Sequence, residues 1–159
     1  MMQGRVYYSS PVGMLVIESQ GDKITVVNFL KSEKLDEHST PATEQCVREL
    51  DEYFYEGRKF FTVEIVPEGT AFQLKIWNEL ITIPYGRTIS YEELAIRAGD
   101  IKSIRAVGLA NGQNPIAIII PCHRVIGKNG DLVGYGGGLE NKTWLLHHEG
   151  AFSQQLKLF

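Results

Sequence analysis

Cysteine is scarce in this sequence, which contains only Cys46 and Cys122 among its 159 residues. Two cysteines are no disulfide framework of the kind that stabilises small secreted domains, and they suit a reducing compartment. The four histidines show no metal-finger spacing relative to the cysteines. We therefore predict no structural zinc site.

Long hydrophobic runs are absent as well. The first ten residues contain no apolar core of a signal peptide, so secretion is not expected. No stretch is long enough to form a transmembrane helix. These two absences predict a protein that is located in the cytoplasm and does not bind a membrane.

The sequence also lacks the large positive charge that would indicate a nucleic-acid-binding protein. Its formal net charge is −3, and 22% charged with 43% hydrophobic residues are ordinary for a globular protein with a buried core. The charge is uneven, because residues 1–69 carry seven Lys and Arg against twelve Asp and Glu. The second half can present basic side chains on one face, although scattered solubilising charge is the simpler interpretation. These side chains are Arg87, Arg97, Lys102, Arg105 and Lys128.

The most informative stretch is residues 118–126, in which a short apolar run leads into Pro121, Cys122 and His123. The run is too short to span a membrane and indicates a buried segment. Proline fixes its own φ angle, so the chain is stiff where it meets the cysteine. A cysteine held in this way beside an imidazole is a candidate nucleophile. The alternative is a small buried hydrophobic residue that happens to precede a histidine.

Activation of Cys122 needs a base or a positive field, because a free cysteine thiol has a pKa of about 8.5. His123 is the nearest base. Neighbours in an extended chain point to opposite faces, however, so a bridging water or a bend is needed. A carboxylate is expected to orient the imidazole, and Glu149 at the end of the last predicted helix is our choice. The alternative for Glu149 is an ordinary carboxylate at the surface end of a helix.

The first half of the chain has the pattern of a strand-rich domain. Segments rich in β-branched and aromatic residues predict strands at residues 6–8, 14–17, 24–30 and 60–66. Thr40 and Pro41 predict the N-cap and first position of a helix that ends near Gly57. Cys46 lies on this helix, four residues before a leucine, and is expected to be a core residue. Residues 67–69 are the best candidate for a domain boundary.

The second half predicts mainly helices. One begins after Thr70, whose capping-box spacing matches that of Ser90 at the start of a second, short helix. Gly99 can end the short helix, and Ser103 can cap a third helix at residues 104–112. Two helices joined by a tight turn indicate a helix-turn-helix.

The end of the chain alternates turns with one more helix. Residues 127–131 have the pattern of a hairpin-like turn, and residues 134–138 are so rich in glycine that a backbone close to a ligand or with positive φ is expected. A plain surface loop is the alternative. The last helix is predicted at residues 139–149, with Gly150 as its cap.

Several segments of the second half occur in an order that is typical of one protein family. They are Pro84-Tyr85-Gly86, Ile89-Ser90-Tyr91-Glu92-Glu93-Leu94-Ala95, Arg105-Ala106-Val107-Gly108, Asn114-Pro115, Ile120-Pro121-Cys122-His123-Arg124-Val125, Tyr135-Gly136-Gly137-Gly138-Leu139 and Trp144-Leu145-Leu146-His147-His148-Glu149-Gly150. Together they closely resemble the O6-alkylguanine-DNA alkyltransferases, also called methylated-DNA–protein-cysteine methyltransferases. The resemblance extends over about residues 70–150, roughly half of the chain. The first 69 residues match only in general style.

The resemblance implies a fold of the α/β (α+β) class with two domains. Residues 1–69 are expected to form an N-terminal ribonuclease-H-like α/β scaffold domain. Residues 70–150 are expected to form a C-terminal winged helix-turn-helix domain that binds DNA and accepts the alkyl group, followed by a tail at residues 151–159. The implied activity is DNA repair by a single, irreversible transfer of a methyl or larger alkyl group from O6 of guanine to Cys122. No cofactor is expected, and the sequence leaves open O4 of thymine as a second substrate.

The resemblance also implies a role for individual residues. Cys122 matches the alkyl acceptor, and a Glu149–His123–water–Cys122 relay is expected to form its thiolate. Asn114 matches the hinge asparagine that lies between the recognition helix and the active site. Tyr91 matches the tyrosine that assists rotation of the nucleotide and protonation of the leaving guanine.

The implied partner is double-stranded DNA, bound mainly through phosphates and the minor groove, by a monomer without an obligatory protein partner. Arg105 matches the arginine that enters the base stack in place of the flipped base. The other expected DNA contacts are Lys102, Ser103, Ala106, Gly108 and Lys128. The expected pocket for the base is formed by Val125, Tyr135, Gly136 and Ala117. Gly136 stands where many relatives have serine, so the backbone donor is kept and a side-chain contact is lost. Ala117 stands where some relatives have proline, and a roomier pocket is expected there. The zinc ligands that some relatives carry in the N-terminal domain are absent.

Three other interpretations stay open. A non-enzymatic lesion sensor would share the scaffold but lack the acceptor cysteine, which is present here. A winged-helix regulator would bind specific sequences and form no covalent product. A cysteine hydrolase would turn over repeatedly, which a thioether product forbids.

Overall fold

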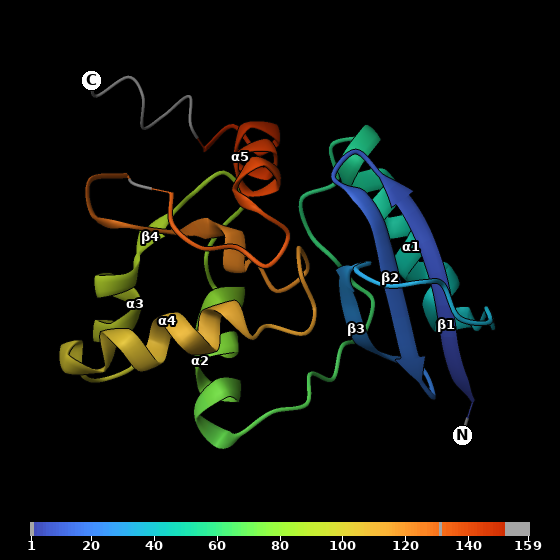
Figure 1. Cartoon of the computed structure of the whole chain (residues 1–159), viewed down its shortest axis with the longest axis horizontal. Coiled ribbons are helices and arrows are strands. Elements are labelled where there is room, and N and C mark those ends of the chain that lie inside the picture. The colour runs from blue at the N-terminus through green and yellow to red at the C-terminus, as the bar shows by residue number, and fades with distance from the viewer. Residues whose placement is uncertain (1, 131, 152–159) are drawn as a thin grey trace. The chain divides into compact units, whose positions relative to one another are not determined.

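The computed structural model describes residues 2–130 and 132–151, which form two compact units (Figure 1). The N-terminal unit contains residues 1–68 and 115–119, and the C-terminal unit contains residues 69–114 and the chain from residue 120. Helices and strands are mixed, as the predicted α/β (α+β) class requires. We predicted an uninterrupted C-terminal domain over residues 70–150, whereas residues 115–119 return to the N-terminal unit. Apart from Ala151, the predicted tail lies outside the described residues.

The N-terminal unit is built on an antiparallel three-stranded sheet. Strands β1 (Gln3–Ser10), β2 (Gly13–Gln20) and β3 (Lys23–Phe29) pair in sequence order, as their residue pattern predicts. Buried residues alternate along β2, with Leu15 and Ile17 fully buried. Such alternation is typical of a sheet that is covered on one face. Helix α1 (Pro41–Tyr55) packs against this sheet (Figure 1).

The start of α1 is fixed by its own sequence, as predicted. The Thr40 side chain accepts a hydrogen bond from the Thr43 N–H, the Thr43 side chain accepts one from the Thr40 N–H, and Pro41 occupies the first turn. This reciprocal cap pairs donors that a helix start otherwise leaves without a partner. Cys46 is fully buried on the inner face of the helix. Burial raises the pKa of the Cys46 thiol to about 12, so Cys46 is a core residue and no second nucleophile.

The predicted strand at residues 60–66 is wrong. Only Ile65 pairs with the sheet, through a parallel bridge to Ile24. The N–H groups of Thr62 and Val63 instead donate to the buried Glu49 carboxylate on α1, at 2.7 and 3.1 Å. A helix side chain therefore satisfies the backbone donors that a strand ladder would have used.

Residues 115–119 extend the sheet along β3. The Val27 N–H donates to the Pro115 carbonyl at 3.0 Å, and the Ala117 N–H donates to the Val27 carbonyl at 2.7 Å. An unpaired strand edge is costly to leave open, and a buried apolar segment needs partners for its backbone groups. This pairing explains why the segment leaves the C-terminal unit although the sequence on both sides belongs to that unit.

The C-terminal unit begins with α2 (Ala71–Ile81), which starts at the predicted Thr70 capping box. The Trp77 side chain lies in the core and donates from Nε1 to the carbonyl of Ala110, at 2.8 Å. This bond ties α2 to the helix that carries Ala110. Gly69 packs so tightly here that a Cβ atom on it would lie 2.5 Å from the Trp77 ring, so any larger residue would force the ring to move.

The predicted helix-turn-helix is formed by α3 (Tyr91–Arg97), the 3₁₀ turn η1 (Ile101–Ser103) and α4 (Ile104–Gly112). Two details of its caps differ from prediction. Ser90 accepts a bond from the Glu93 N–H, but the Glu93 carboxylate pairs with Arg97 rather than completing a capping box. Ser103 does not cap α4, because its hydroxyl donates to the carbonyl of Asp100 at 2.6 Å.

The remaining elements surround the predicted nucleophile. Strand β4 (Ile89–Ser90) pairs in parallel with β5 (Val125–Ile126), which follows the 3₁₀ turn η2 (Cys122–Arg124). The hairpin-like turn predicted at residues 127–131 is a 3₁₀ turn, η3 (Lys128–Gly130), and its last residue lies outside the described residues. Helix α5 (Leu139–His148) ends at Gly150 with φ of 77°, as predicted. Among the described residues, no helix has the length and apolar character needed to span a membrane.

Candidate functional site

Cys122 is held by two consecutive tight turns. Its N–H donates to the Ile120 carbonyl at 2.8 Å, across Pro121, whose φ and ψ of −82° and 64° are those of an inverse γ-turn. The 3₁₀ turn η2 then begins at Cys122 itself. The extended conformation assumed for Cys122 and His123 is therefore wrong. The chain has the bend that was named as one way for the two neighbouring side chains to interact.

The Cys122 side chain is buried, with 7% of the residue exposed. Burial raises the pKa of its thiol, while a hydrogen bond from Asn114 and the positive charge of Lys142 lower it. Asn114 also donates from Nδ2 to the Ile120 carbonyl at 2.7 Å, so it is fixed beside the turn that carries the cysteine. The resting group is a thiol whose conversion to thiolate depends on its neighbours.

His123 and Glu149 form a fully buried pair, with 2.8 Å between Nε2 and Oε2. The side chains of both residues are 0% exposed. An ionised carboxylate can only accept, so Nε2 carries the proton and Nδ1 of a neutral imidazole is the acceptor. Nδ1 is buried and has no hydrogen-bond partner among the described residues. It is thus available to take a proton, directly or through a water molecule.

The pKa directions of this pair agree with that assignment. Burial lowers the pKa of His123 below its usual value of 6.5 against the opposing effect of Glu149, so the imidazole is neutral at rest. The pKa of Glu149 is lowered despite its burial, because His123 and Arg124 interact with the carboxylate. A neutral imidazole beside a permanent carboxylate is a general base whose protonated form is stabilised as it appears.

Arg124 is a site residue that sequence reasoning missed. Its guanidinium donates from Nε to Oε1 of Glu149 at 2.8 Å and from Nη2 to Oε2 at 3.0 Å. A further N–H, on Nη1, donates to the Ile83 carbonyl at 2.7 Å. Its place in the Pro-Cys-His-Arg motif was the one signal in the sequence, because the burial that makes it need a carboxylate partner is shown only by the fold.

Lys142 is a second residue that was missed. It is completely buried on α5, and Nζ donates to the carbonyls of Val125 and Val133 at 2.7 and 3.0 Å. Burial lowers its pKa to about 8, against the opposing effect of Cys122. Its ammonium group thus fastens the loop that precedes α5 to β5 and supplies positive charge close to the cysteine. A lysine inside a helix gives no sequence signal of burial, because lysine is almost always exposed.

Two aromatic residues border Cys122. The Tyr91 hydroxyl donates to the Val133 carbonyl at 3.3 Å, and the Lys142 ammonium group lies 5.8 Å from the centre of its ring. Burial, and then the proximity of Cys122, raise the pKa of both Tyr91 and Tyr135. Cys122, His123, Glu149, Asn114, Tyr91, Val125 and Tyr135 are therefore brought into one cluster, although they come from five separate segments.

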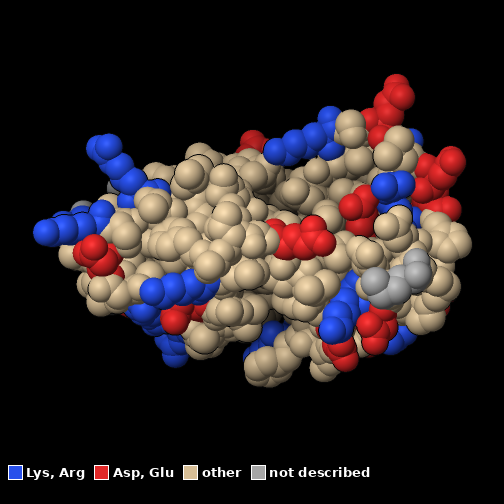
Figure 2. All heavy atoms as spheres, turned by 90° about the horizontal axis from the view of Figure 1, so that it is seen from below, with Lys and Arg blue, Asp and Glu red and all other residues tan. Residues whose placement is uncertain are grey.

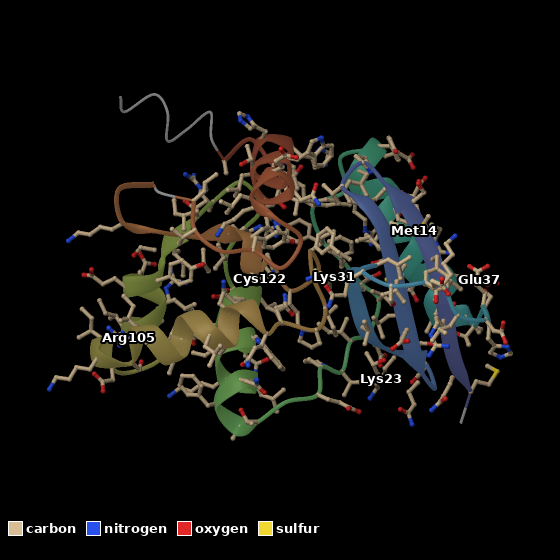
Figure 3. All side chains as sticks on the ribbon, viewed as in Figure 1. Met14, Lys23, Lys31, Glu37, Arg105 and Cys122 are labelled. Atoms are coloured by element: carbon tan, nitrogen blue, oxygen red, sulfur yellow. The ribbon has the colours of Figure 1, made fainter. Side chains whose placement is uncertain are left out.

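The predicted DNA contacts lie on a different part of the unit. Lys102, Arg105 and Ala106 are exposed on η1 and α4, and Figure 3 shows Arg105 at the start of α4, apart from Cys122. Gly108 instead faces α3, where a Cβ atom would lie 3.8 Å from the Tyr91 ring. Ser103 is partly buried and bonded to Asp100. α4 contains no acidic residue, so its exposed charge is positive.

Three other predicted residues are placed as follows. Lys128 is exposed on η3, and Gly136 is exposed in the loop before α5. Ala117 belongs to the N-terminal unit, where it pairs with Val27. In Figure 2, the surface of the C-terminal unit (left) is largely neutral, with Lys and Arg and a few Asp and Glu side chains around its margin.

The cluster has the parts needed for a nucleophilic substitution. It combines a buried thiol, a neutral base with a free acceptor nitrogen, a carboxylate that stabilises the protonated base, and a phenol. No group of His, Cys, Asp and Glu side chains in the described residues could hold a metal ion.

Two family models match the chain. The "6-O-methylguanine DNA methyltransferase, ribonuclease-like domain" matches residues 5–67, and the "6-O-methylguanine DNA methyltransferase, DNA binding domain" matches residues 71–151. Together these matches extend over most of both units.

Curated and solved proteins are similar over nearly the whole chain. The methylated-DNA–protein-cysteine methyltransferase of Methanosarcina acetivorans is 45% identical over 150 residues, which cover 91% of this chain and 96% of the relative. The Haemophilus influenzae protein of the same name is 46% identical over 150 residues, covering 90% and 84%. The Mycobacterium tuberculosis O6-methylguanine methyltransferase structure superposes with a TM-score of 0.82 at 41% identity, covering 94% of each chain. A structure of the Mycobacterium tuberculosis protein in complex with DNA gives a TM-score of 0.83 at 44% identity, covering 91% of each chain.

Proposed function

This chain belongs to the 6-O-methylguanine DNA methyltransferase family, and we propose that it repairs alkylated DNA by direct reversal with Cys122 as the acceptor. A methyl or larger alkyl group passes from O6 of guanine to the cysteine sulfur. Because the product is a thioether, each molecule reacts once. We propose O4-alkylthymine as a second alkyl donor, to be tested in the same assay.

One observation carries the proposal: Cys122 is buried beside a His123–Glu149 pair whose free imidazole nitrogen has no other partner among the residues described. A hydrolase would need the same base, but it would also need water to reach its covalent intermediate. An alkyltransferase needs no such water, because its thioether product has no leaving group that water can displace at neutral pH. The same cluster therefore suits both a hydrolase and an enzyme that reacts once. The family of the chain decides between the two.

We propose the following reaction. His123 Nδ1 takes the thiol proton through one bridging water, and Glu149 stabilises the imidazolium that forms. The sulfur attacks the alkyl carbon, and the bond between this carbon and O6 breaks with its electron pair left on the guanine. The Tyr91 phenol then gives its proton to the guanine, which leaves as the normal base. Asn114 fixes the turn before Cys122, and Val125, Tyr135 and Gly136 border the pocket that receives the base.

A base inside a duplex cannot reach a buried thiolate, so the alkylated nucleotide must rotate out of the helix. Unstacking costs a few kcal/mol, and an inserted guanidinium offsets part of it. We propose that Arg105, exposed at the start of α4, enters the gap from the minor groove. We propose that Lys102, Ser103 and Lys128 contact phosphates and that Ala106 lets α4 approach the sugar-phosphate backbone closely. We propose that Gly108 contributes by seating Tyr91 rather than by touching DNA.

The proposal is tested by the mass of the intact protein after mixing with a short duplex that contains O6-methylguanine. We expect a gain of one methyl group that maps to Cys122 and stops at one equivalent. Cys122→Ala should bind the duplex and gain nothing. Tight binding without a mass change in the unaltered protein would instead support a lesion sensor. Neither binding nor transfer would support the regulator or the hydrolase.

A second measurement tests the oligomeric state and the groove. We expect a monomer in sedimentation with and without a single-site duplex. A minor-groove ligand such as an A·T-specific dye should compete with binding, whereas a bulky group attached in the major groove should not.

A further inference from the structure

Asn111, near the buried end of α4, lies between Cys122 and Tyr91. The proposed reaction begins at the Cys122 thiol and ends with the proton that Tyr91 donates. Its side chain is 4% exposed, and Nδ2 donates to the Cys122 carbonyl at 3.4 Å. Tyr91 lies on the same side of α4, because its ring packs over Gly108, one helical turn before Asn111. The amide thus faces the turn that carries the cysteine and the helix that carries the phenol.

The hydrogen bonds around Asn111 are incomplete. Its Oδ1 atom is buried and has no partner within the described part of the chain. The bond from Nδ2 to Cys122, at 3.4 Å, and the bond from the Tyr91 hydroxyl to Val133, at 3.3 Å, are both longer than usual. A buried amide that is only weakly bound is costly, and the second N–H of Asn111 has capacity for another acceptor.

The phenol oxygen of Tyr91 is the acceptor that fits. Burial raises the pKa of Tyr91 and Cys122 raises it further, whereas a hydrogen bond from the Asn111 side chain lowers it. A phenol that gives up its proton becomes a phenolate, and a phenolate accepts hydrogen bonds much more strongly than a phenol. The hydrogen bond from Asn111 therefore strengthens while the phenol loses its proton. An interaction that is stronger in the transition state than in the ground state accelerates the step.

We propose that Asn111 is a positioning residue for Tyr91, holding the phenol over the base pocket and stabilising the phenolate that remains when the guanine leaves. This inference rests on the proposed function. In that step the Tyr91 O–H bond breaks, an N–H bond forms on the guanine, and the phenolate accepts a hydrogen bond from Asn111 Nδ2. A proton from water restores the phenol after the base has left.

The test compares two reagents that alkylate Cys122 with different leaving groups. O6-benzylguanine releases guanine, which needs a proton, whereas iodomethane releases iodide, which needs none. Rate constants for both follow from the mass of the intact protein at a series of times. Because neither reagent is DNA, effects on duplex binding do not enter.

Asn111→Leu removes the donor with little change in size, and Asn111→Asp replaces the donor with a negative charge. We expect both to react about tenfold more slowly with benzylguanine, as for loss of one hydrogen bond to a charged group. Asn111→Leu should react with iodomethane within about twofold of the unaltered protein, because it introduces no charge near the thiolate. The carboxylate of Asn111→Asp disfavours the thiolate as well, so only the leucine variant is compared with iodomethane. Gln113→Leu, which removes an exposed amide two residues away, is the matched control and should change neither rate.

A double variant distinguishes positioning of Tyr91 from a separate effect. In a Tyr91→Phe background, Asn111→Leu should cost nothing further with benzylguanine, because the phenol it serves is gone. Equal losses with both reagents, or a further tenfold loss in that background, would overturn the inference. So would an Asn111→Leu protein with unchanged rates. An unaltered protein that reacts with iodomethane but gains no methyl group from O6-methylguanine in a duplex would overturn the proposed function as well, and so separates the two failures.

Discussion

Arg124 and Glu149 form a two-pronged ion pair in the interior of the C-terminal unit, with distances of 2.8 and 3.0 Å between their nitrogen and oxygen atoms. Glu149 uses Oε2 for His123 at the same time. The carboxylate that orients the base is therefore itself oriented by the neighbour of the base in the sequence. Two consecutive residues of η2 thus hold one carboxylate at the C-terminal end of α5.

Replacing Arg124 by lysine keeps the positive charge but removes the bidentate contact with the Glu149 carboxylate. One ammonium group cannot reach both carboxylate oxygens and the Ile83 carbonyl together, so the pair is broken in part. We expect the free energy of unfolding to fall by about 2–4 kcal/mol, near the cost of breaking a buried ion pair. Urea denaturation measures this change. Arg97→Lys, at an exposed pair on α3, is the control and should change stability by less than about 0.5 kcal/mol. Equal effects at the two positions would show that burial of the Arg124 pair adds nothing.

Stability should fall on acidification in two stages. The pKa of His123 is lowered by burial, so below its usual value of 6.5 the unfolded chain takes up a proton that the folded protein excludes. The pKa of Glu149 is also lowered, so its contribution is complete above its usual value of 4.5 and is lost as pH falls below it. Both groups bind more protons in the unfolded state, so the two effects have the same sign.

Urea denaturation at pH 7.5, 5.5 and 4, chosen on either side of the usual pKa values of 6.5 and 4.5, checks this prediction. His147→Asn, at an exposed position next to the end of α5, should leave the profile unchanged. His123→Gln should flatten the first stage and also reduce the second, because His123 contributes to the lowered pKa of Glu149. A profile that is level between pH 7.5 and 5.5 would contradict a neutral buried His123.

The sequence predicted the reacting residues of the site better than the residues that hold them in place. Cys122, His123 and Glu149 were chosen because nucleophiles, bases and orienting carboxylates belong to few residue types. Their contacts were then fixed by one bend at Pro121, where the sequence had indicated only a stiff chain. Arg124 and Lys142 were missed because both residue types are usually exposed, and only the fold shows that these two are buried.

The errors in secondary structure have the same origin. Residues 60–66 have the composition of a strand, but the Glu49 carboxylate on α1 takes two of their N–H groups. Residues 115–119 lie among helical sequence, yet the edge of β3 takes them into the other unit. In both cases a partner far away in the chain decided the outcome, which local propensity cannot report. Caps made within four residues, at Thr40 and Thr70, were predicted correctly.

Lys142→Met should make Cys122 harder to ionise. The ammonium group lowers the pKa of the buried thiol, and methionine keeps the packing while it removes this charge. We expect the pH dependence of alkylation by iodomethane to move to higher pH by about one unit, and the rate at pH 7 to fall about tenfold. Above pH 8 the difference should shrink, because the pKa of Lys142 itself is about 8 and its charge is lost there.

The control for Lys142 is Lys102→Met, which removes an exposed charge from η1. It should leave the pH profile unchanged. A constant ratio of rates between the Lys142 variant and the unaltered protein from pH 6 to 9 would show that Lys142 only holds the loop, through its bonds to Val125 and Val133.

The Arg105→Ala variant separates extrusion of the nucleotide from the duplex from alkyl transfer to Cys122. Arg105 is exposed at the start of α4 and apart from Cys122, so its loss should not change the thiolate (Figure 3). If its guanidinium fills the stack, removing it leaves the full cost of unstacking, which is a few kcal/mol. We expect transfer from O6-methylguanine in a duplex to slow by at least about tenfold, and reaction with free benzylguanine to stay within about twofold.

Arg105→Lys refines this test, because it keeps the phosphate-binding charge and removes the planar group that stacks. It should retain the affinity for undamaged DNA and its dependence on salt, yet lose most of the rate on the duplex. A duplex in which the alkylated guanine faces no base is already partly unstacked and should recover part of that rate. Losses that are equal on the duplex and on benzylguanine would instead mean that Arg105 acts on the fold around Cys122. A lysine variant with the full rate would show that charge alone is enough.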